Sequence, residues 1–570
     1  MADILRIDLA SGAASAAPAP ADLAGLGGRG LTSAMVAAEV DPKTDPLGPG
    51  NLLVIAGGIL AGTSVPNSGR LSVGAKSPLT GGIKEANSGG QAARKLANLG
   101  IRAIALSGAA PELSIIEVDT AGARLKAAPE LAGKGSYDTI AALRSTYGDN
   151  VAVVCCGPAG EMKLKSAAVI VTTQEFLPRT ASRGGMGAVM GSKNVKAVVI
   201  NDKGAERTKV ANPEALKVAV KAFSEGVRSH PAMGALEALG TPFLINVANS
   251  IGCMATQNFS AGAFDEVEAL SGEHMVGLLS GRPNAKTNHR CMTGCIVNCS
   301  QVYTDEKGEV VTSGFEFESL VLLGSNCGIS DMDQLAKIDR LCDDLGIDTM
   351  EVGAALAVAM EGGRLPWGDG ATAYKLLAGI ADGNPDSLMI ASGCVATGAA
   401  LGVSRVPAVK GQSMAAWEPR VLKGTGVTYA TSPMGADHTC GNALPSPTMP
   451  DYNPSSPEGQ AGMSQFLQAW FGAIDTLGLC LFPSLACLDI PDLQVLLRQA
   501  TAAVLGEELP EDYLVTLGAK VIMGERDFNR RAGFTAADDR LPAFMTVEAL
   551  PPTGNVFDVS DADLDSVFAQ

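Results

Sequence analysis

VKAVVI (residues 195–200) and NPEALKVAVKAFSEGV (residues 212–227) stand on either side of the point where the pattern of the chain changes. The first is a short apolar run typical of a buried strand, whereas the second repeats apolar residues at helical spacing. Before this point, runs such as NLLVIAGG and VAVVCCG lie between turns rich in glycine and proline, which predicts strands. After it, segments such as MDQLAKIDRLCDDLG and SQFLQAWFGAIDTLG keep the helical pattern.

This change predicts an α+β protein built from a β-rich N-terminal domain and two mostly helical domains. We place the N-terminal domain at residues 1–205 and the helical domains at 206–410 and 411–570, which agrees with roughly 100–200 residues per domain. The opening MADILRIDLASG carries an acidic residue early and lacks the basic and apolar regions of a signal peptide. It predicts the first strand of a cytoplasmic protein.

The composition argues against several classes of protein. The 570 residues include 60 acidic and 43 basic side chains, a formal charge of −17, which argues against binding nucleic acid or an anionic membrane surface. A hydrophobic fraction of 46% is enough for a sizeable core. No run of about 18 apolar residues occurs, so no membrane span is expected.

Three of the twelve cysteines lie close together in the sequence, in CMTGCIVNCS. Disulfides explain cysteines poorly in a large chain without an export signal, and most of the others have the pattern of small buried hydrophobes. Cys291, Cys295 and Cys299 have the spacing C-x3-C-x3-C. This spacing indicates a metal ion or an iron–sulfur cluster.

Two other interpretations of the cysteine motif stay open at this point. The first is a helix, on which the three thiols would lie along one face over about 12 Å. This distance is too long for one compact cluster, so ligation requires a bend in the segment. Gly294 permits such a bend. Zinc is less favoured, because structural zinc sites use C-x2-C pairs and His289 is the only histidine nearby. A cluster would also need a fourth ligand.

A short Asp-x-x-Gly motif occurs twice, each time at the end of a predicted amphipathic helix. The copies are DDLGID (residues 343–348) and DTLGLC (residues 475–480). Either copy alone would be an ordinary helix capped by glycine. As a pair, they place carboxylates where these could accept hydrogen bonds from the N–H groups of flat heterocycles such as pterins. Cys480 replaces the last aspartate of the second copy, which puts a thiol where a cluster needs its fourth sulfur.

Together these features resemble the aldehyde ferredoxin oxidoreductase family, whose members hold tungsten, rarely molybdenum, between two pterin dithiolenes beside a [4Fe–4S] cluster. The resemblance implies a β-rich base for the cofactor, over which two helical domains close. Further similar blocks occur in the same order along essentially the whole chain: RLSVGAKSPLTGGIKEANSGG (70–90), ASRGGMGAVMGSKNVKAVVI (181–200), FEFESLVLLGSNCGI (315–329), YATSPMGADHTCG (429–441) and ERDFNRRAGFTAADDRLP (525–542).

The resemblance assigns cofactor roles to residues of the first two blocks. Arg70 would lie between the cofactor and the cluster. Asn87 and Gly89 would lie near the pterin phosphates, which a Mg²⁺ ion bridges, and an amide oxygen suits this ion. The backbone of Arg183 and Gly184 would complete the phosphate and magnesium site, because glycine-rich loops expose N–H groups to phosphate.

The two Asp-x-x-Gly motifs would bind the pterins. By the same resemblance, Asp343 and Asp348 would bind one pterin, and Asp475 with Leu479 the other. Cys480 would be the fourth ligand of the cluster, together with the three cysteines of the motif. Family members commonly show C-x2-C-x3-C, so the first cysteine here lies one residue further upstream than in the family pattern.

Glu318, in FEFES, and His438, in GADHT, are the expected acid–base residues, because the resemblance places both next to the metal. Glu316, two residues earlier, is the alternative glutamate. None of the four histidines has a glutamate three residues before it. The iron that bridges two subunits in some family members is therefore not expected.

The resemblance implies oxidation of an aldehyde with water to a carboxylic acid. Electrons would leave through the cluster to ferredoxin or to an iron–sulfur partner subunit. One alternative is a low-potential reductase, like the benzoyl-CoA reductase subunits of the same family, and another is a homologue without redox turnover. The sequence leaves open the aldehyde, the choice of tungsten or molybdenum, the electron partner and whether the chain forms a homo-oligomer.

Overall fold

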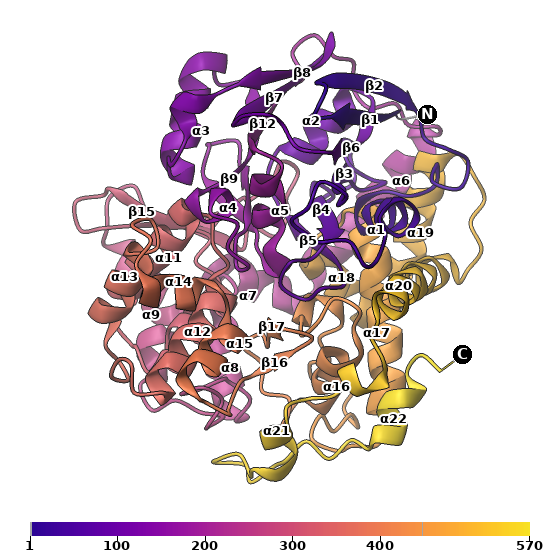
Figure 1. Cartoon of the computed structure of the whole chain (residues 1–570). Helices are drawn as coiled ribbons and strands as arrows, with labels where there is room; N and C mark the ends of the chain where they lie inside the picture. The colour runs from indigo at the N-terminus through magenta and orange to yellow at the C-terminus, as the bar shows by residue number, and fades with distance from the viewer. Residues whose placement is uncertain (1–2, 447, 570) are drawn as a thin grey trace.

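Two six-stranded sheets form the N-terminal lobe of the computed structural model, which describes residues 3–446 and 448–569 (Figure 1). In spatial order, the first sheet contains β2 (Ala13–Pro18), β1 (Asp3–Asp8), β6 (Ile101–Ser107), β3 (Leu53–Gly57), β4 (Leu71–Lys76) and β5 (Ile83–Ser88). The second contains β11 (Pro178–Ala181), β10 (Val169–Thr172), β9 (Val151–Cys156), β12 (Val195–Asn201), β7 (Ser114–Asp119) and β8 (Gly122–Ala127). The pairs β1–β6 and β7–β12 are parallel, and the other neighbours are antiparallel.

Both faces of these sheets are covered, which explains why several strands are continuous apolar runs. Leu53 of β3 points into a core that the first sheet shares with Val154 of the second. Val54, the next residue, packs on the opposite face against α1 (Gly28–Glu39). The outer face of the second sheet is covered by α3 (Ser136–Tyr147).

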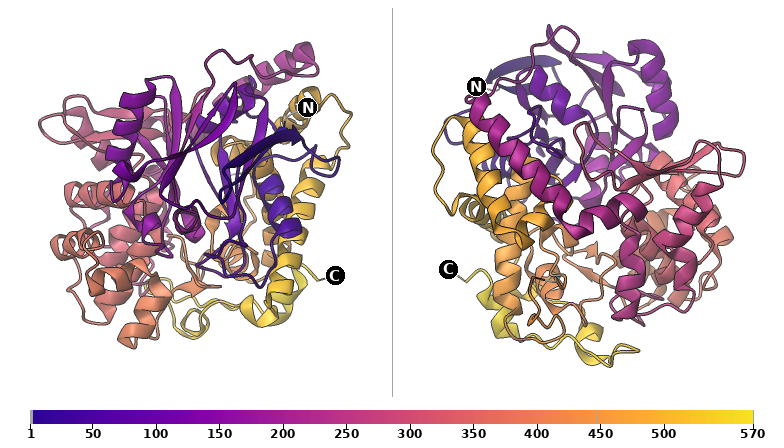
Figure 2. Two further views of the ribbon diagram at one scale, coloured as in Figure 1. Left: turned by 45° about the horizontal axis from the view of Figure 1, so that its top comes forward. Right: turned by 180° about the vertical axis from the view of Figure 1, so that it is seen from behind.

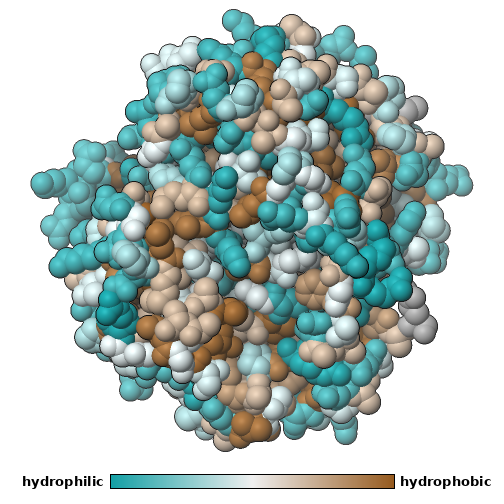
Figure 3. Space-filling view, in the orientation of Figure 1, coloured by the Kyte–Doolittle hydropathy of each residue, from teal (hydrophilic) through white to brown (hydrophobic). Residues whose placement is uncertain are grey.

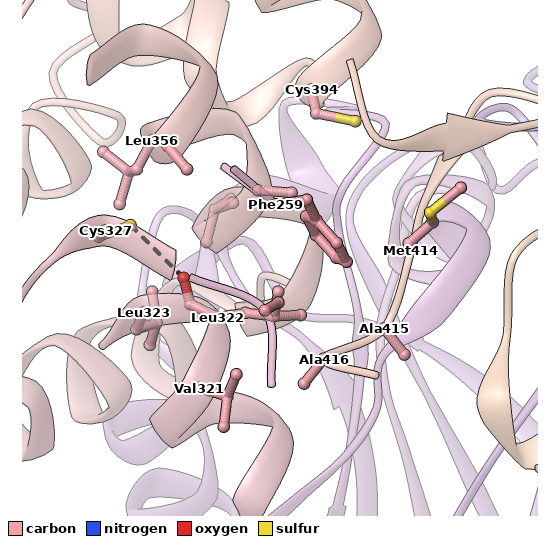
Figure 4. Packing of buried hydrophobic residues seen from close by; sticks show 14 of the residues in the cluster. Phe259, Val321, Leu322, Leu323, Cys327, Leu356, Cys394, Met414, Ala415 and Ala416 are labelled. Carbon is pink, nitrogen blue, oxygen red and sulfur yellow. Dashed lines mark hydrogen bonds between the residues drawn. The ribbon is translucent and has the colours of Figure 1, made fainter. Parts of the chain in front are cut away.

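The second lobe is helical and is built around the almost fully buried helix α12 (Thr349–Glu361). This helix is apolar on nearly all sides, as expected of a helix in the centre of a core. Phe259, Leu322 and Leu356 belong to the same core (Figure 4), where the Cys327 thiol donates a hydrogen bond to the Leu322 carbonyl at 3.4 Å. The other elements of this lobe are α8 (Phe243–Ser250), α9 (Gly272–Ser280), α10 (Phe317–Leu323), α11 (Met332–Leu345), α13 (Gly370–Ala378), α14 (Pro385–Ala391), α15 (Cys394–Leu401), and a small sheet of β13 (Lys286–His289), β14 (Ser300–Thr304) and β15 (Val310–Ser313).

The third lobe packs α17 (Gln460–Leu477) against α20 (Tyr513–Ala532). A Cβ atom at Gly518 would overlap the carbonyl oxygen of Ala469, so this close crossing requires glycine. The same lobe contains α16 (Lys423–Thr431), α18 (Leu481–Asp489), α19 (Pro491–Leu505), α21 (Ala543–Val547) and α22 (Asp561–Ser566). A short hairpin, β16 (Ala408–Val409) and β17 (Gln412–Ser413), precedes it.

A long helix, α6 (Pro213–Ser229), crosses the back of the molecule (Figure 2, right) and packs on α19. The next helix, α7 (Pro231–Leu239), leads toward the second lobe. Although α6 lies within the predicted domain 206–410, its apolar face shares a core with the third lobe. The domain boundaries at 205 and 410 stay predictions.

The structure confirms the α+β fold and the predicted change from strands to helices. The apolar run at 195–200 lies in β12, and the segment at 212–227 lies in α6. Hydrophilic residues cover much of the face shown in Figure 3, and hydrophobic residues form several separate patches on it. Within residues 3–446 and 448–569, no helix is long and apolar enough to span a bilayer.

Candidate active site

The cysteine motif forms an irregular loop and not a helix. Residues 290–299 carry no helical segment, and Gly294 adopts the left-handed φ of +80°. Glycine accepts this conformation without strain, so the bend that ligation requires is present. The interpretation as three thiols in line on a helix is therefore wrong.

The thiols of this loop meet a fourth thiol, from the residue that precedes α18. The pKa of Cys299 is raised well above its usual value, first by burial and then by the negative charges of Glu316 and the other three thiols. A Cβ atom at Gly89 would lie 3.1 Å from the sulfur of Cys291, so the first cysteine faces the end of β5. The structure thus brings together the four predicted ligands: Cys291, Cys295, Cys299 and Cys480.

The donor set fits an iron–sulfur cluster better than a single metal ion. With Zn–S bonds of about 2.3 Å, four thiolates around one zinc would hold their sulfurs within about 4 Å of one another. In the described part of the chain, no three Cys, His, Asp or Glu side chains form a group that could hold one metal ion. A four-iron cluster takes four cysteines, one per iron, and spaces their sulfurs more widely.

Asn67, which the sequence analysis missed, joins the two cysteine-bearing segments. Its backbone N–H donates to the carbonyl of Gly294 at 3.1 Å, and its carbonyl accepts from the N–H of Cys480 at 2.8 Å. Asn67 is only 1% exposed and has a left-handed φ of 56°, which asparagine tolerates better than most residues. One buried residue therefore connects the loop of the motif to the end of α17.

Arg70 lies close to both the cysteine site and Asp475 of the second Asp-x-x-Gly motif. Its guanidinium donates hydrogen bonds to the side-chain and backbone oxygens of Asn87, the latter at 3.0 Å. Its positive charge lowers the pKa of both Cys480 and Asp475, although burial outweighs this effect at each. A fixed positive charge therefore acts on both the cysteine site and the end of α17.

Asp475 lies in the last turn of α17, within a group of buried polar side chains. Its carboxylate accepts a hydrogen bond from the Asn87 amide at 3.2 Å and faces Arg29 at 3.5 Å. Burial raises the pKa of Asp475 to about 6. Burial and the charge of Asp475 raise the pKa of neighbouring Glu85 to about 8, and one oxygen of Glu85 has no partner among the described residues. Leu479, four residues after Asp475, is also buried.

Both Asp-x-x-Gly motifs end their helices as predicted. Gly346 and Gly478 cap α11 and α17 with left-handed φ values of 67° and 72°. Asp343 is buried, and burial together with the charge of Asp339 raises its pKa well above the usual range. Asp348 caps the N-terminus of α12 by accepting from the backbone N–H of its second residue, and burial raises the pKa of Asp348 to about 6.

The Arg183 side chain contacts both the first Asp-x-x-Gly motif and the segment that precedes His438. Its side chain lies 3.4 Å from Asp348 and donates to the carbonyl of Ala436 at 2.7 Å. Gly184 has a left-handed φ of 81°, and a Cβ atom there would overlap the stem of Lys84 in β5. The Arg183 side chain is therefore occupied by protein partners.

Glu318, on α10, and His438, in the loop after α16, lie side by side. Their Oε1 and Nε2 atoms are 3.2 Å apart, within ion-pair distance but without the alignment of a hydrogen bond. The other oxygen of Glu318 accepts from the N–H of Ala416 at 2.7 Å. Next to this pair, the ammonium group of Lys84, at 2.8 Å, keeps Asp437 ionised, and the pKa of Asp437 is lowered far below its usual value.

Glu316, the alternative glutamate, has a different environment. It accepts a hydrogen bond from the hydroxyl of Thr241 at 2.6 Å, and its charge acts on Cys299. The structure therefore places Glu316 on the cysteine side and Glu318 on the histidine side.

Tyr429, the first residue of the YATSP block, was missed by the sequence analysis. It is fully buried, and its hydroxyl has no partner among the described residues. Burial raises its pKa, and Glu318 is the charge that raises this pKa most.

The sequence matches two protein-family models that together cover most of the chain. Residues 4–202 match "Aldehyde ferredoxin oxidoreductase, N-terminal domain", and residues 218–569 match "Aldehyde ferredoxin oxidoreductase, domains 2 & 3". The chain belongs to the aldehyde ferredoxin oxidoreductase family. It is therefore an oxidoreductase, and the family implies a tungsten–pterin centre and a [4Fe–4S] cluster.

Several relatives within the aldehyde ferredoxin oxidoreductase family match over most of their length. The tungsten-containing aldehyde ferredoxin oxidoreductase of Pyrococcus furiosus is 34% identical, over 93% of this chain and 88% of the relative. That of Thermococcus kodakarensis is 33% identical over 97% and 92%. An aliphatic sulfonate oxidoreductase, WOR-like subunit, of Pyrococcus furiosus is 26% identical over 74% and 71%.

The fold is also that of a solved structure, the active site complex BamBC of benzoyl coenzyme A reductase with 1,5-dienoyl-CoA. The TM-score is 0.79, with 20% identity over 95% of this chain and 90% of the other. This similarity confirms the fold of the family member described here. The same fold therefore occurs in an enzyme that is named for benzoyl coenzyme A and not for an aldehyde.

Proposed function

We propose that the protein oxidises an aldehyde to a carboxylic acid at a tungsten or molybdenum bis-pterin centre and passes the electrons through a [4Fe–4S] cluster. The observation that carries this proposal is the pair formed by Glu318 and His438, 3.2 Å apart. A carboxylate and an imidazole so placed, in a chain of this family, are suited to moving protons at one reacting carbon. The relatives at 33% and 34% identity are named for aldehyde oxidation, which supports the same reaction.

Glu318 is the proposed base. Its Oε2 is held by the N–H of Ala416, so Oε1 is the atom left to accept a proton from water as the water adds to the aldehyde. His438 would donate from Nε2 to the aldehyde oxygen and so polarise the carbonyl. Overall, an aldehyde and one water give a carboxylic acid, two protons and two electrons. The bound metal–pterin centre would supply the acceptor for those two electrons.

The two helix ends would hold the pterins. Asp475 accepts a hydrogen bond from Asn87 of β5, and the charge of Arg183 acts on Asp348. We propose that Asp343 and Asp348 bind one pterin and that Asp475 and Leu479 bind the other. Burial raises the pKa of these carboxylates because it disfavours their ionised form. N–H donors of a bound heterocycle would stabilise that ionised form. The cysteine site with Cys480 would lie directly beyond the second pterin.

The loops at the ends of β5 and β11 would bind the pterin phosphates. Arg183 and Gly184 lie in a tight, buried turn that directly follows β11 and contacts β5. We propose that Asn87 and Gly89 also lie near the phosphates and that Mg²⁺ bridges these, with an amide oxygen among its ligands. Few protein ligands are needed, since Mg²⁺ keeps phosphate oxygens and water in its shell.

The proposed electron acceptor is ferredoxin or an iron–sulfur partner subunit. Cys291 is the only partly exposed thiol of the four, which favours the side of the loop 290–299 as the exit for electrons. We also propose a cytoplasmic location, where thiols such as those of the cysteine site stay reduced.

A second candidate reaction is low-potential reduction of an aromatic thioester. The structural match with the benzoyl coenzyme A reductase complex, at a TM-score of 0.79, is the observation that favours it. The two reactions would use the same cofactor and differ in the direction of electron flow.

A dye assay on the purified holoenzyme distinguishes the two reactions. With an oxidised viologen dye, a panel of aliphatic and aromatic aldehydes should reduce the dye and yield the matching acids. With a reduced dye and an aromatic CoA thioester, no dye oxidation is expected. Dye oxidation by the thioester without any aldehyde activity would contradict the proposed function and support the second candidate.

A further inference from the structure

The side chain of Asn67 contacts a sulfur of the cysteine site directly. Its Nδ2 donates to the Sγ of Cys295 at 3.2 Å, and its Oδ1 accepts from the backbone N–H of Ile296 at 3.0 Å. A backbone N–H can only donate, so this second bond fixes which end of the amide faces the sulfur. The donor is therefore held toward Cys295 by the loop itself.

A hydrogen bond of this kind affects the charge balance of a cluster ligand. An N–H group pointed at a thiolate stabilises negative charge on it, and a reduced cluster carries one more negative charge than an oxidised one. Asn67 and Cys295 are 1% and 5% exposed, so water competes little for the bond. The donor therefore favours the reduced cluster and raises its reduction potential.

We propose that Asn67 is a positioning residue of the [4Fe–4S] site, which joins its two cysteine-bearing segments and raises the cluster potential through its bond to Cys295. The proposal rests on the cluster assigned to the four thiols above. Asn67 is far from the motif in sequence, and its left-handed backbone is what aims both its amide and its carbonyl at the site.

The substitution Asn67→Gly removes only the side-chain part of this arrangement. Glycine accepts the φ of 56° and keeps the backbone bonds to Gly294 and Cys480. The measurement is an EPR-monitored redox titration of the cluster in the purified holoenzyme, together with its iron content. We expect full iron content and a cluster potential more negative than in the wild-type protein.

Asn298→Gly is the matched control. Asn298 has the same φ of 56° and lies in the same loop, and its backbone N–H also approaches the sulfur of Cys295, at 3.3 Å. Its side chain instead points away, to Glu237 and Arg290. Glycine keeps the backbone donor, so this variant should retain the wild-type potential.

The outcomes separate the hydrogen bond from a general loosening of the loop. An unchanged potential in Asn67→Gly, or equal shifts in both variants, would overturn the proposal. If Asn67→Gly fails to retain the cluster, wild-type enzyme labelled with ¹⁵N in its asparagine amides should show a ¹⁵N hyperfine coupling to the reduced cluster, and absence of this coupling would overturn it. Iron-free wild-type protein would instead refute the cluster itself.

Discussion

Glu318 and His438 are the residues on which turnover should depend most. General acid–base groups typically contribute about 10²–10⁴-fold to a rate. We therefore expect His438→Ala and Glu318→Gln each to lower kcat by roughly this range, while the tungsten and iron content stays at the wild-type level. Dye-coupled kinetics and metal analysis of the same preparations check this.

His274→Ala provides the control for the histidine variant, because His274 is exposed on α9. It should keep the wild-type kcat. Full activity in His438→Ala would remove this histidine from the mechanism. Glu316→Gln adds a further comparison: a kcat loss there as large as in Glu318→Gln would contradict the assignment of the two glutamates to different sides of the site.

At the scale of the element, the C-cap of α17 positions both Leu479 and Cys480. Gly478 is left-handed, and a Cβ atom on it would lie 2.8 Å from the Cα of Gly58. Gly402 caps α15 with nearly the same φ, 68°, but has nothing within 4 Å of such an atom. Alanine should cost roughly 1–2 kcal/mol at Gly402 from backbone strain alone and more at Gly478.

Thermal unfolding and iron content test this pair of variants. Gly478→Ala should lower Tm further than Gly402→Ala and should also lose iron, because the chain that carries Cys480 must shift. Equal Tm values together with equal iron contents would show that the close contact with Gly58 has no structural role.

The N-cap of α12 gives the cofactor-free chain a pH dependence. The pKa of Asp348 is raised from 3.8 to about 6 by burial, so the folded protein binds a proton that the unfolded chain releases. This contribution to stability is fully present below pH 4 and is lost as the pH rises through 6, a change of roughly 3 kcal/mol.

Asp348→Asn should remove this part of the dependence. Asparagine caps a helix about as well as aspartate, so the capping bond to Met350 is retained. Between pH 4.5 and 7.5, Tm of the cofactor-free variant should fall less steeply than Tm of the wild-type chain. Parallel Tm curves for the two proteins would be evidence against the raised pKa.

Local sequence pattern was enough to predict the main helices and to single out the cysteine motif. Periodicity located α6, α11 and α17, and the glycines of the two Asp-x-x-Gly motifs predicted their C-caps. Asn67 could not be found in this way, because its role comes from contacts with residues more than 200 positions away. The packing of α6 on the third lobe has the same cause: amphipathicity shows that a face is buried but not what covers it.

At the scale of the whole molecule, the N-terminal and third lobes are joined by a buried ion pair. Arg29 on α1 donates to Glu525 on α20 at 2.9 and 2.7 Å, and both are almost fully buried. Glu525→Gln leaves the arginine without its main counter-charge, which should cost roughly 3–5 kcal/mol and lower Tm markedly.

Asp527→Asn, on the same helix, is the control for this variant. Asp527 is exposed and pairs with Arg530 and Arg531 at the surface, where such pairs are worth about 0–1 kcal/mol. Its Tm should stay close to the wild-type value. A Tm loss as large as that of Glu525→Gln would show that the buried pair has no special role in joining the lobes.

Metal analysis of the protein purified anaerobically from its native host tests the proposed site most directly, with Cys480→Ala and Cys487→Ala as paired variants. Cys487 is also buried, but its thiol donates a hydrogen bond to the carbonyl of Pro483 at 3.2 Å. We predict about four irons and one tungsten or molybdenum per chain in the wild type and in Cys487→Ala, and loss of iron in Cys480→Ala. Wild-type protein without iron, or a full iron complement in Cys480→Ala, would contradict the assignment of the four thiols to one cluster.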